Sequence, residues 1–245
     1  MKIDVLTLFP ELFNSFQEWS IISRTIEKNI FSLNAINIRD FSDDKHKRVD
    51  DYPFGGGPGM IMRPEPIYEA ISETRTEDSM VIYLSPQGKP YNQQLANTLS
   101  KEKHLILLCG HYEGVDNRII DNFIDLEISI GDYVLTGGEI PALVLIESII
   151  RLLPGTLSSK ESYMDESHYS GMLEHSQYTR PRSFKGLDVP EVLLSGNHKK
   201  IDEWRKYSSF KNTYIKRPDL LDKLKLTEEE AEILRRIKKE IEEKN

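Results

Sequence analysis

Cysteine is nearly absent from this sequence of 245 residues, since Cys109 is the only one. A single cysteine allows neither an internal disulfide nor a cysteine-based zinc cluster, and such usage is typical of proteins of the reducing cytosol. Long hydrophobic runs are also missing, because stretches such as LILLC and ALVLIESII stop short of the ~18 apolar residues that a membrane span needs. The N-terminal MKIDVLTLF has strand alternation and an early acid, unlike a signal peptide. We therefore expect a globular cytoplasmic protein that does not enter a membrane.

Two common nucleotide-binding patterns are absent as well. The sequence has no G-x-G-x-x-G between a strand and a helix, and no G-x-x-x-x-G-K-[ST]. The stretch SIGDYVLTGGEIP nevertheless places Gly137 and Gly138 directly after an apolar run, Tyr133 to Leu135, that has strand character. Paired glycines leave bare backbone that a ligand can approach closely. If a ligand binds here, it is held differently from a dinucleotide or a P-loop nucleotide.

Positive charge is in deficit overall but concentrated in one segment. The formal net charge is -8, which argues at first against a nucleic-acid partner. Between Arg180 and Arg217, however, ten Lys and Arg face four Asp and Glu, a local balance of +6 that leaves -14 for the rest of the chain. A polyanion responds to the local patch more than to the total charge. The segment indicates either a nucleic-acid contact or an ordinary solvated basic surface.

The first two thirds of the chain alternate between strand and helix patterns. KIDVLTLF, LNAINIRDF, MVIYLSP, HLILLCG and the Tyr133 run are typical of strands, whereas PIYEAISETR and ALVLIESIIRLL show helical spacing. This order predicts an α/β domain whose mostly parallel sheet has helices on both faces. We expect it to span residues 1–160, followed by an interdomain active-site loop (161–176) and a small helical domain (177–245). Thr227 and Glu230 predict a capping box on its last helix.

Three glycine-containing stretches follow the predicted strands. They are LSPQG, CGHYEG and LTGGE, and a fourth stretch, DDYPFGGGPGM, places four glycines within five residues around Pro58. In a parallel sheet the carboxyl ends of the strands share one edge, so the three loops can converge there on a single ligand. Each glycine turn taken alone is more often only a turn. Three at one edge favour a binding site.

The motifs GGGPGM, LSPQG, CGHYEGVDNR, SIGDYVLTGGEIP, IIRLLPG and QYTRP, in this order, resemble the bacterial tRNA (guanine-N1)-methyltransferase family, TrmD, of the SPOUT superfamily. The similarity extends over nearly the whole chain. It implies transfer of a methyl group from S-adenosylmethionine to N1 of the guanosine immediately 3′ of the anticodon of tRNA, position thirty-seven, which supports reading-frame maintenance. It also implies a deep trefoil knot in the sheet domain, and a homodimer that binds the tRNA anticodon stem-loop with its active site at the subunit interface.

The resemblance assigns residues to three roles. The methyl-donor pocket is expected to be lined by Leu84, Ser85, Pro86, Gln87, Gly110, Tyr112, Glu113, Gly114, Ser129, Ile130, Gly131, Tyr133, Leu135, Gly137, Gly138 and Pro141. The tRNA is expected to contact Gly55, Gly56, Gly57, Pro58, Gly59, Met60, Arg180, His198, Lys199 and Arg205. Magnesium is a further expectation of the family, with Asp132, Glu139 and the acidic loop before QYTRP as candidate neighbours, but no metal-ligand spacing in the sequence assigns its site.

The reaction itself states which catalytic groups are needed. Guanine N1 carries a proton that a base must remove, and the negative charge that develops on O6 suits a planar guanidinium. By resemblance the cation is Arg151. Where most relatives have Asp-Ser-aromatic, this sequence has Glu166-Ser167-His168 with Asp165 before it, so the base is Glu166 or Asp165. His168 is a third candidate in this loop, because histidine is the residue type whose ordinary pKa lies nearest neutral pH. Glu174 matches another acidic position of the family and is expected to support the base.

Other classes of protein share part of these features. A dehydrogenase would share the α/β alternation but needs the missing dinucleotide pattern. A non-catalytic RNA-binding module would explain the basic segment, in which Trp204 lies among lysines, but not the glycine loops. Another SPOUT enzyme, acting on the ribose 2′-OH, would share the knot but not the combination of GGGPGM with the loop before QYTRP.

Overall fold

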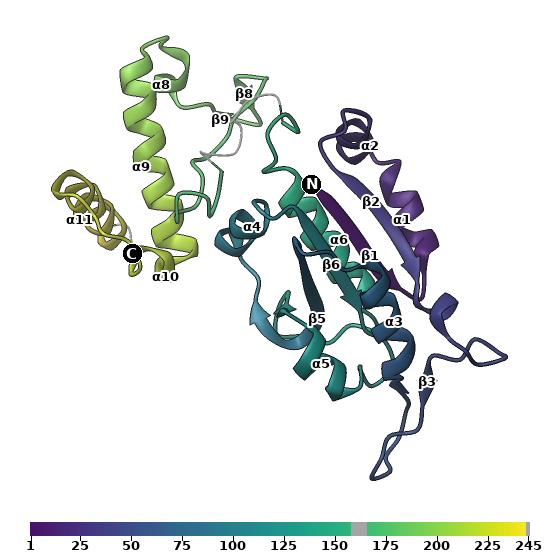
Figure 1. The fold of residues 1–245 in the computed structure, drawn as a ribbon. Coiled ribbons are helices and arrows are strands. Elements are labelled where there is room, and N and C mark those ends of the chain that lie inside the picture. Colours follow the sequence, from purple (N-terminus) through teal and green to yellow (C-terminus); the bar gives the residue numbers. More distant parts are fainter. Residues whose placement is uncertain (158–165, 244–245) are drawn as a thin grey trace. The chain divides into compact units, whose positions relative to one another are not determined.

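A computed structural model describes residues 1–157 and 166–243 of the chain (Figure 1). Asp165, one of the two candidate bases, lies outside the described residues. The chain divides into two compact units, Met1–Ser159 and Lys160–Asn245. Each unit has its own hydrophobic core and is described by itself.

The first unit is built on a five-stranded, wholly parallel sheet in the order β2-β1-β6-β5-β7. The strands are β1 (Lys2–Thr7), β2 (Ser32–Asn37), β5 (Ser79–Pro90), β6 (His104–Cys109) and β7 (Leu126–Ser129). Every residue of the central strand β6 is buried. A strand buried on both faces reads as a continuous apolar run, which is why HLILLC occupies this position. The α/β class with a parallel sheet, expected from the sequence, is confirmed.

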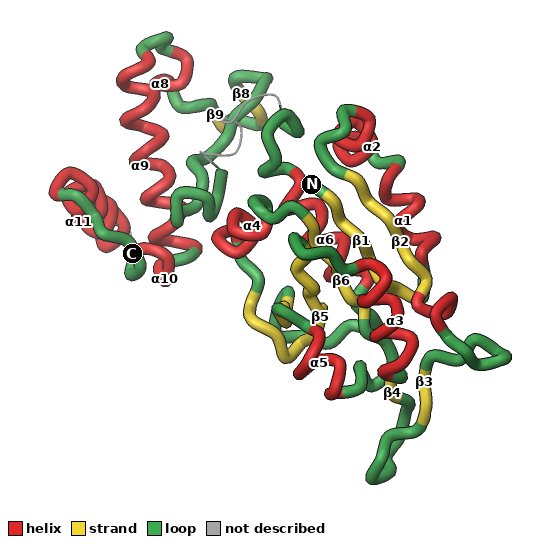
Figure 2. The backbone as a smooth tube through the Cα atoms, in the orientation of Figure 1, coloured by secondary structure: helices red, strands yellow, loops and turns green. Residues whose placement is uncertain are grey.

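Helices cover both faces of the sheet because alternate strand residues point to opposite sides. Leu105 and Leu107 of β6 pack with α1 (Pro10–Gln17), α2 (Ser20–Glu27), α4 (Gln93–Leu99) and α6 (Glu139–Ile150). Ile106 and Leu108 pack instead with α3 (Pro64–Thr74), the short 3-10 helix η1 (Ile38–Phe41) and α5 (Asn117–Phe123). A small hairpin, β3 (Asp50–Asp51) and β4 (Ile61–Met62), carries a loop that extends away from the sheet (Figure 2).

Three local predictions were wrong. Residues 133–135 are not a strand: β7 ends at Ser129, and Tyr133 and Val134 are 54% and 81% exposed. LSPQG does not follow the end of a strand, because β5 continues to Pro90 and accommodates this stretch as a register shift between Leu84 and Lys89. The strand expected over LNAINIRDF stops at Asn37, whose side chain accepts a hydrogen bond from the backbone of Arg39 and starts η1.

The second unit is mostly helical. It contains a hairpin, β8 (Ser183–Phe184) and β9 (Leu187–Asp188), and the helices α8 (Glu191–Leu194), α9 (His198–Lys216), α10 (Pro218–Leu221) and α11 (Glu228–Glu242). Phe210, Leu221 and Ile237 form the buried centre of this unit. The capping box predicted at Thr227 and Glu230 is confirmed at the start of α11. None of the helices within the described residues is long and apolar enough to cross a membrane.

Candidate active site

A cavity of about 220 Å³ lies at the carboxyl edge of the sheet, where β5, β6 and β7 approach their ends. Three stretches form its wall: residues 83–87, residues 110–114, and residues 128–131 and 133–138 together with Pro141. Every residue that the resemblance assigned to the donor pocket lies on this wall. Tyr83, His111, Ile128, Val134 and Thr136 also line it, and the sequence reasoning missed them. Their position beside the assigned motifs was the only available signal.

Gly138 lets the start of α6 lie directly against the end of β6. A Cβ atom at this position would lie 2.6 Å from the Cα of Cys109 and 3.0 Å from the backbone nitrogen of Gly110. The Gly138 N–H donates a hydrogen bond to the carbonyl of Gly110 at 3.0 Å, and His111 and Gly137 form an antiparallel bridge. The paired glycines therefore serve close approach of two chain segments that both line the cavity.

The remaining wall is shaped by two aromatic side chains packed on glycines. A Cβ on Gly110 would meet the Tyr83 ring at 2.9 Å, and one on Gly131 would meet the Tyr133 ring at 2.5 Å. Gly131 also has a φ of +154°, which favours glycine. Burial, and then the negative charge of Glu127, raises the pKa of Tyr83 to about 12. Tyr83 is therefore a neutral hydroxyl across the physiological range.

A buried network of polar groups lies behind this wall. The carboxylate of Glu139 accepts a hydrogen bond from the Thr7 hydroxyl at 2.6 Å and lies 2.7 Å from Nε2 of His111. Glu139 is 6% exposed. Cys109 is fully buried, and burial, followed by the negative charge of Glu139, raises the pKa of its thiol. Both oxygens of Glu139 thus have protein partners, which leaves it poorly suited as a magnesium neighbour.

The glycine loop between β3 and β4 is attached to the cavity at one end and open at the other. A Cβ on Gly59 would lie 2.4 Å from the Glu113 side chain, and the Glu113 N–H donates to the Met60 carbonyl at 2.9 Å. Gly55, Gly56 and Gly57 all have positive φ and would have no atom within 4 Å of an added Cβ. Pro58, which follows them, is exposed as well. The loop therefore presents free backbone next to the cavity segment that holds Glu113.

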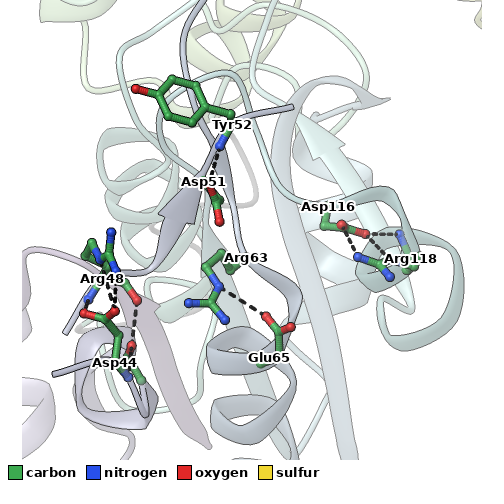
Figure 3. Close-up of polar contacts among 9 residues, drawn as sticks. Asp44, Arg48, Asp51, Tyr52, Arg63, Glu65, Asp116 and Arg118 are labelled. Carbon is green, nitrogen blue, oxygen red and sulfur yellow. Dashed lines mark hydrogen bonds and ion pairs between the residues drawn. The ribbon is translucent and has the colours of Figure 1, made fainter. Parts of the chain in front are cut away.

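Charged side chains near this loop are engaged in local ion pairs (Figure 3). Asp44 pairs with Arg48 and Asp116 with Arg118, each at 2.7 Å, while Arg63 lies 3.4 Å from Glu65. The Arg48 guanidinium, with backbone hydrogen bonds, holds the pKa of Asp44 well below its ordinary value. Exposed pairs of this kind contribute little to stability. They do hold the charged side chains around the loop in defined positions.

The candidate catalytic groups come from both units. Arg151 follows the last turn of α6 as its C-cap, in the first unit. Glu166 and Glu174 belong to the second unit, where the backbone of Glu174 accepts a hydrogen bond from the Asn212 amide at 2.8 Å. His168 has a φ of +73° and its N–H donates to the Met172 carbonyl at 2.7 Å, which closes a tight turn after Glu166. Neither unit alone contains all of the candidate catalytic groups.

The candidate tRNA contacts of the second unit are exposed. Arg180 precedes the β8 hairpin, while His198, Lys199 and Arg205 lie on α9. The structure places two further rings beside Trp204, whose ring lies 6.3 Å from that of His175 and 6.1 Å from that of Tyr178. Among the described residues, no group of three His, Cys, Asp or Glu side chains could hold a metal ion.

Comparison with known proteins agrees with the motifs. A family model described as tRNA (Guanine-1)-methyltransferase TrmD matches residues 1–223. The tRNA (guanine-N(1)-)-methyltransferase of Ruminiclostridium cellulolyticum is 60% identical over 227 residues, which cover 91% of this chain and 97% of that protein. The proteins of the same name from Dictyoglomus turgidum and Staphylococcus carnosus are each 52% identical, over 99% and 98% of this chain and 99% of their own length. The chain belongs to the tRNA (guanine-1)-methyltransferase TrmD family.

Proposed function

We propose that this protein transfers a methyl group from S-adenosylmethionine to N1 of a guanosine in tRNA, the nucleotide immediately 3′ of the anticodon, and thereby supports maintenance of the reading frame. The observation that supports the proposal most strongly is the cavity at the sheet edge. Its wall contains every residue that family motifs assign to the methyl donor. The chain also matches proteins named tRNA (guanine-N(1)-)-methyltransferase over nearly its whole length.

The cavity has the chemistry that such a donor requires. Leu84, Ile130 and Leu135 offer apolar contact to a purine ring, and the glycine stretches offer backbone donors and acceptors. Neither Lys nor Arg occurs among the residues that line this cavity, whereas Glu113 does. When bound, S-adenosylmethionine supplies an electrophilic methyl group on a positively charged sulfur. A wall without cationic side chains is compatible with that charge.

The chain's own groups would do the remaining work. Glu166 or Asp165 would accept the proton of guanine N1, and the Arg151 guanidinium would stabilise the charge that develops on O6. Position matters as much as basicity, because the reacting atoms must be held in line. The backbone around Glu174 is fixed to α9 through Asn212, which limits how far the segment after Glu166 can shift.

An RNA-binding surface and a second subunit complete the proposal. The basic segment 180–217 would contact phosphates of the anticodon stem-loop, with the open loop Gly55–Gly57 on the nucleobase side. On α6, Ile140 and Val144 are 52% and 42% exposed, which supports a partner subunit against this helix. A trefoil knot, a cytoplasmic location and magnesium dependence are proposed on the family resemblance alone.

Mass spectrometry of nucleosides from tRNA incubated with the protein and S-adenosylmethionine tests the function. We expect N1-methylguanosine from a tRNA with guanosine 3′ of the anticodon, and none from the same tRNA with adenosine at that position. A 2′-O-methylated nucleoside instead would indicate a different SPOUT reaction. Binding of tRNA without any methylated product would indicate a non-catalytic RNA-binding module.

A further inference from the structure

A buried carboxylate lies directly behind the wall of the cavity. Glu139 is the first residue of α6 and is 6% exposed. Its Oε2 would lie 2.6 Å from a Cβ placed on Gly137, a residue of the cavity wall. The ring of His111 lies closer still, at 2.3 Å, so the missing side chain of Gly137 leaves room for this carboxylate and its imidazole partner directly beside the backbone of the cavity wall.

The hydrogen bonds of Glu139 suit its ionised form. The Thr7 hydroxyl accepts a hydrogen bond from the Phe9 N–H at 2.9 Å, so its single proton is free to be donated to Oε1 of Glu139 at 2.6 Å. Nε2 of His111 lies 2.7 Å from Oε2, and as an N–H it is a second donor. Glu139 also occupies the first turn of α6, where the helix dipole stabilises negative charge.

No side chain of fixed positive charge opposes Glu139 in this network. Within the described part of the chain, its hydrogen-bond partners are a hydroxyl and an imidazole, and the residues that line the cavity include neither Lys nor Arg. The negative charge of Glu139 also reaches the neighbouring strand end, because it contributes, after burial, to the raised pKa of the Cys109 thiol. In a buried environment of low effective dielectric, such a charge acts over a longer range than on the surface.

We propose that Glu139 is a specificity-determining residue of the donor pocket: its buried charge favours the cationic methyl donor over the uncharged thioether product of the same reaction. The inference rests on the proposed function. S-adenosylmethionine carries a positive sulfur, and S-adenosylhomocysteine has a neutral thioether in its place but is otherwise alike. A negative wall therefore holds the substrate and weakens retention of the product, which assists turnover.

Glu139→Gln tests this, because glutamine has the same shape and still accepts from Thr7 while its amide donates to His111 in the other ring tautomer. Calorimetry should measure the affinities of both compounds for the parent and the variant. A unit charge acting across roughly 10 Å at an effective dielectric constant of about 25 changes affinity about tenfold. We therefore expect the preference for S-adenosylmethionine over S-adenosylhomocysteine to fall about tenfold.

Glu147→Gln is the matched control, because it removes an exposed carboxylate from the same helix outside the cavity wall. Its ratio of affinities for S-adenosylmethionine and S-adenosylhomocysteine should stay within twofold of the parent's ratio. If Glu139→Gln does not fold, His111→Arg places a fixed positive charge beside Glu139, and the preference should again fall. An equal loss of both affinities, with the ratio unchanged, would overturn the inference and leave Glu139 as an anchor of α6. A parent protein that binds neither compound would overturn the donor assignment itself.

Discussion

Replacing Gly138 with alanine tests whether close backbone approach builds the donor pocket. Gly138 has φ -81° and ψ -5°, so its backbone suits any residue, and only the space around it demands glycine. An added Cβ would lie 2.6 Å from the Cα of Cys109 and 3.0 Å from the nitrogen of Gly110. Two carbon atoms in good contact are about 3.5 to 4.0 Å apart, so one segment must move by about 1 Å.

The movement cannot be absorbed by a flexible side chain, because the obstructing atoms are the backbone and Cβ of a fully buried strand end. The start of α6 must shift, which strains the hydrogen bond from Gly138 to the Gly110 carbonyl and the bridge between His111 and Gly137. Overpacking of this kind costs about 1 to 3 kcal/mol of unfolding free energy. Because both displaced segments line the cavity, we expect affinity for S-adenosylmethionine to fall at least about tenfold.

Urea unfolding and calorimetric titration with S-adenosylmethionine measure the two effects. Gly56→Ala is the control: its φ of +79° strains an alanine, but no atom lies within 4 Å of the added Cβ. It should cost about 1 to 2 kcal/mol of stability and leave donor affinity unchanged. The reasoning is refuted if Gly138→Ala retains the parent's urea midpoint and donor affinity.

Three further predictions concern catalysis, pH and RNA. Arg151→Ala should lower single-turnover methyl transfer by orders of magnitude while calorimetric donor affinity stays within about threefold, since its partner charge forms only during reaction; a large loss of affinity would place it in the donor pocket instead. The buried Tyr83 hydroxyl should contribute its full stability below pH ~10 and lose it as the pH rises towards 12, its pKa in the folded protein. In urea unfolding, Tyr83→Phe should flatten this alkaline decline of the unfolding free energy. If the variant's unfolding free energy declines with pH as steeply as the parent's, burial of Tyr83 is not the cause. Neutralising Lys199, Lys200 and Arg205 together should flatten the log-log salt dependence of tRNA affinity by about two to three units; a triple variant with the parent's slope would show that the RNA binds elsewhere.

The sequence predicted the sheet core because burial on both faces leaves a direct pattern. HLILLC is apolar at every position after its first histidine and became the central strand β6. The glycine stretches do converge on one cavity, although only CGHYEG directly follows the end of a strand, and the residues that the family motifs assigned to the donor line that cavity. These features are local in sequence or follow from general topology. They could therefore be obtained without coordinates.

The strand expected at Tyr133 to Leu135 shows where local pattern misleads. Aromatic and branched residues favour strands because they fit a half-buried pleated surface. Here they lie on the cavity wall, and the true strand LEIS, interrupted by a glutamate, pairs with β5 instead. Hydrophobic side chains that serve a binding site or a partner surface cannot be distinguished in sequence from those that serve a sheet.

The network behind the cavity could not be predicted for a different reason. Thr7 and Glu139 are separated by 132 positions, and their hydrogen bond exists only because β1 and the start of α6 meet beside β6. Neither residue belongs to a local pattern that announces burial. A glutamate in the first turn of a helix is most simply interpreted as an exposed group that complements the dipole. Only the packing of the unit makes it a buried charge.

The separation of charge along the chain resolves the apparent conflict between an acidic protein and an RNA substrate. The two proposed substrates carry opposite charges at the points of contact: a sulfonium on the donor and phosphates on the tRNA. The cavity wall has Glu113 and no Lys or Arg, whereas residues 180–217 hold a local balance of +6. Salt screens charges over a Debye length of about 8 to 10 Å, so each ligand responds chiefly to the charged groups nearest to it. Each site can therefore attract its own ligand, and the net charge of -8 describes the field at neither of them.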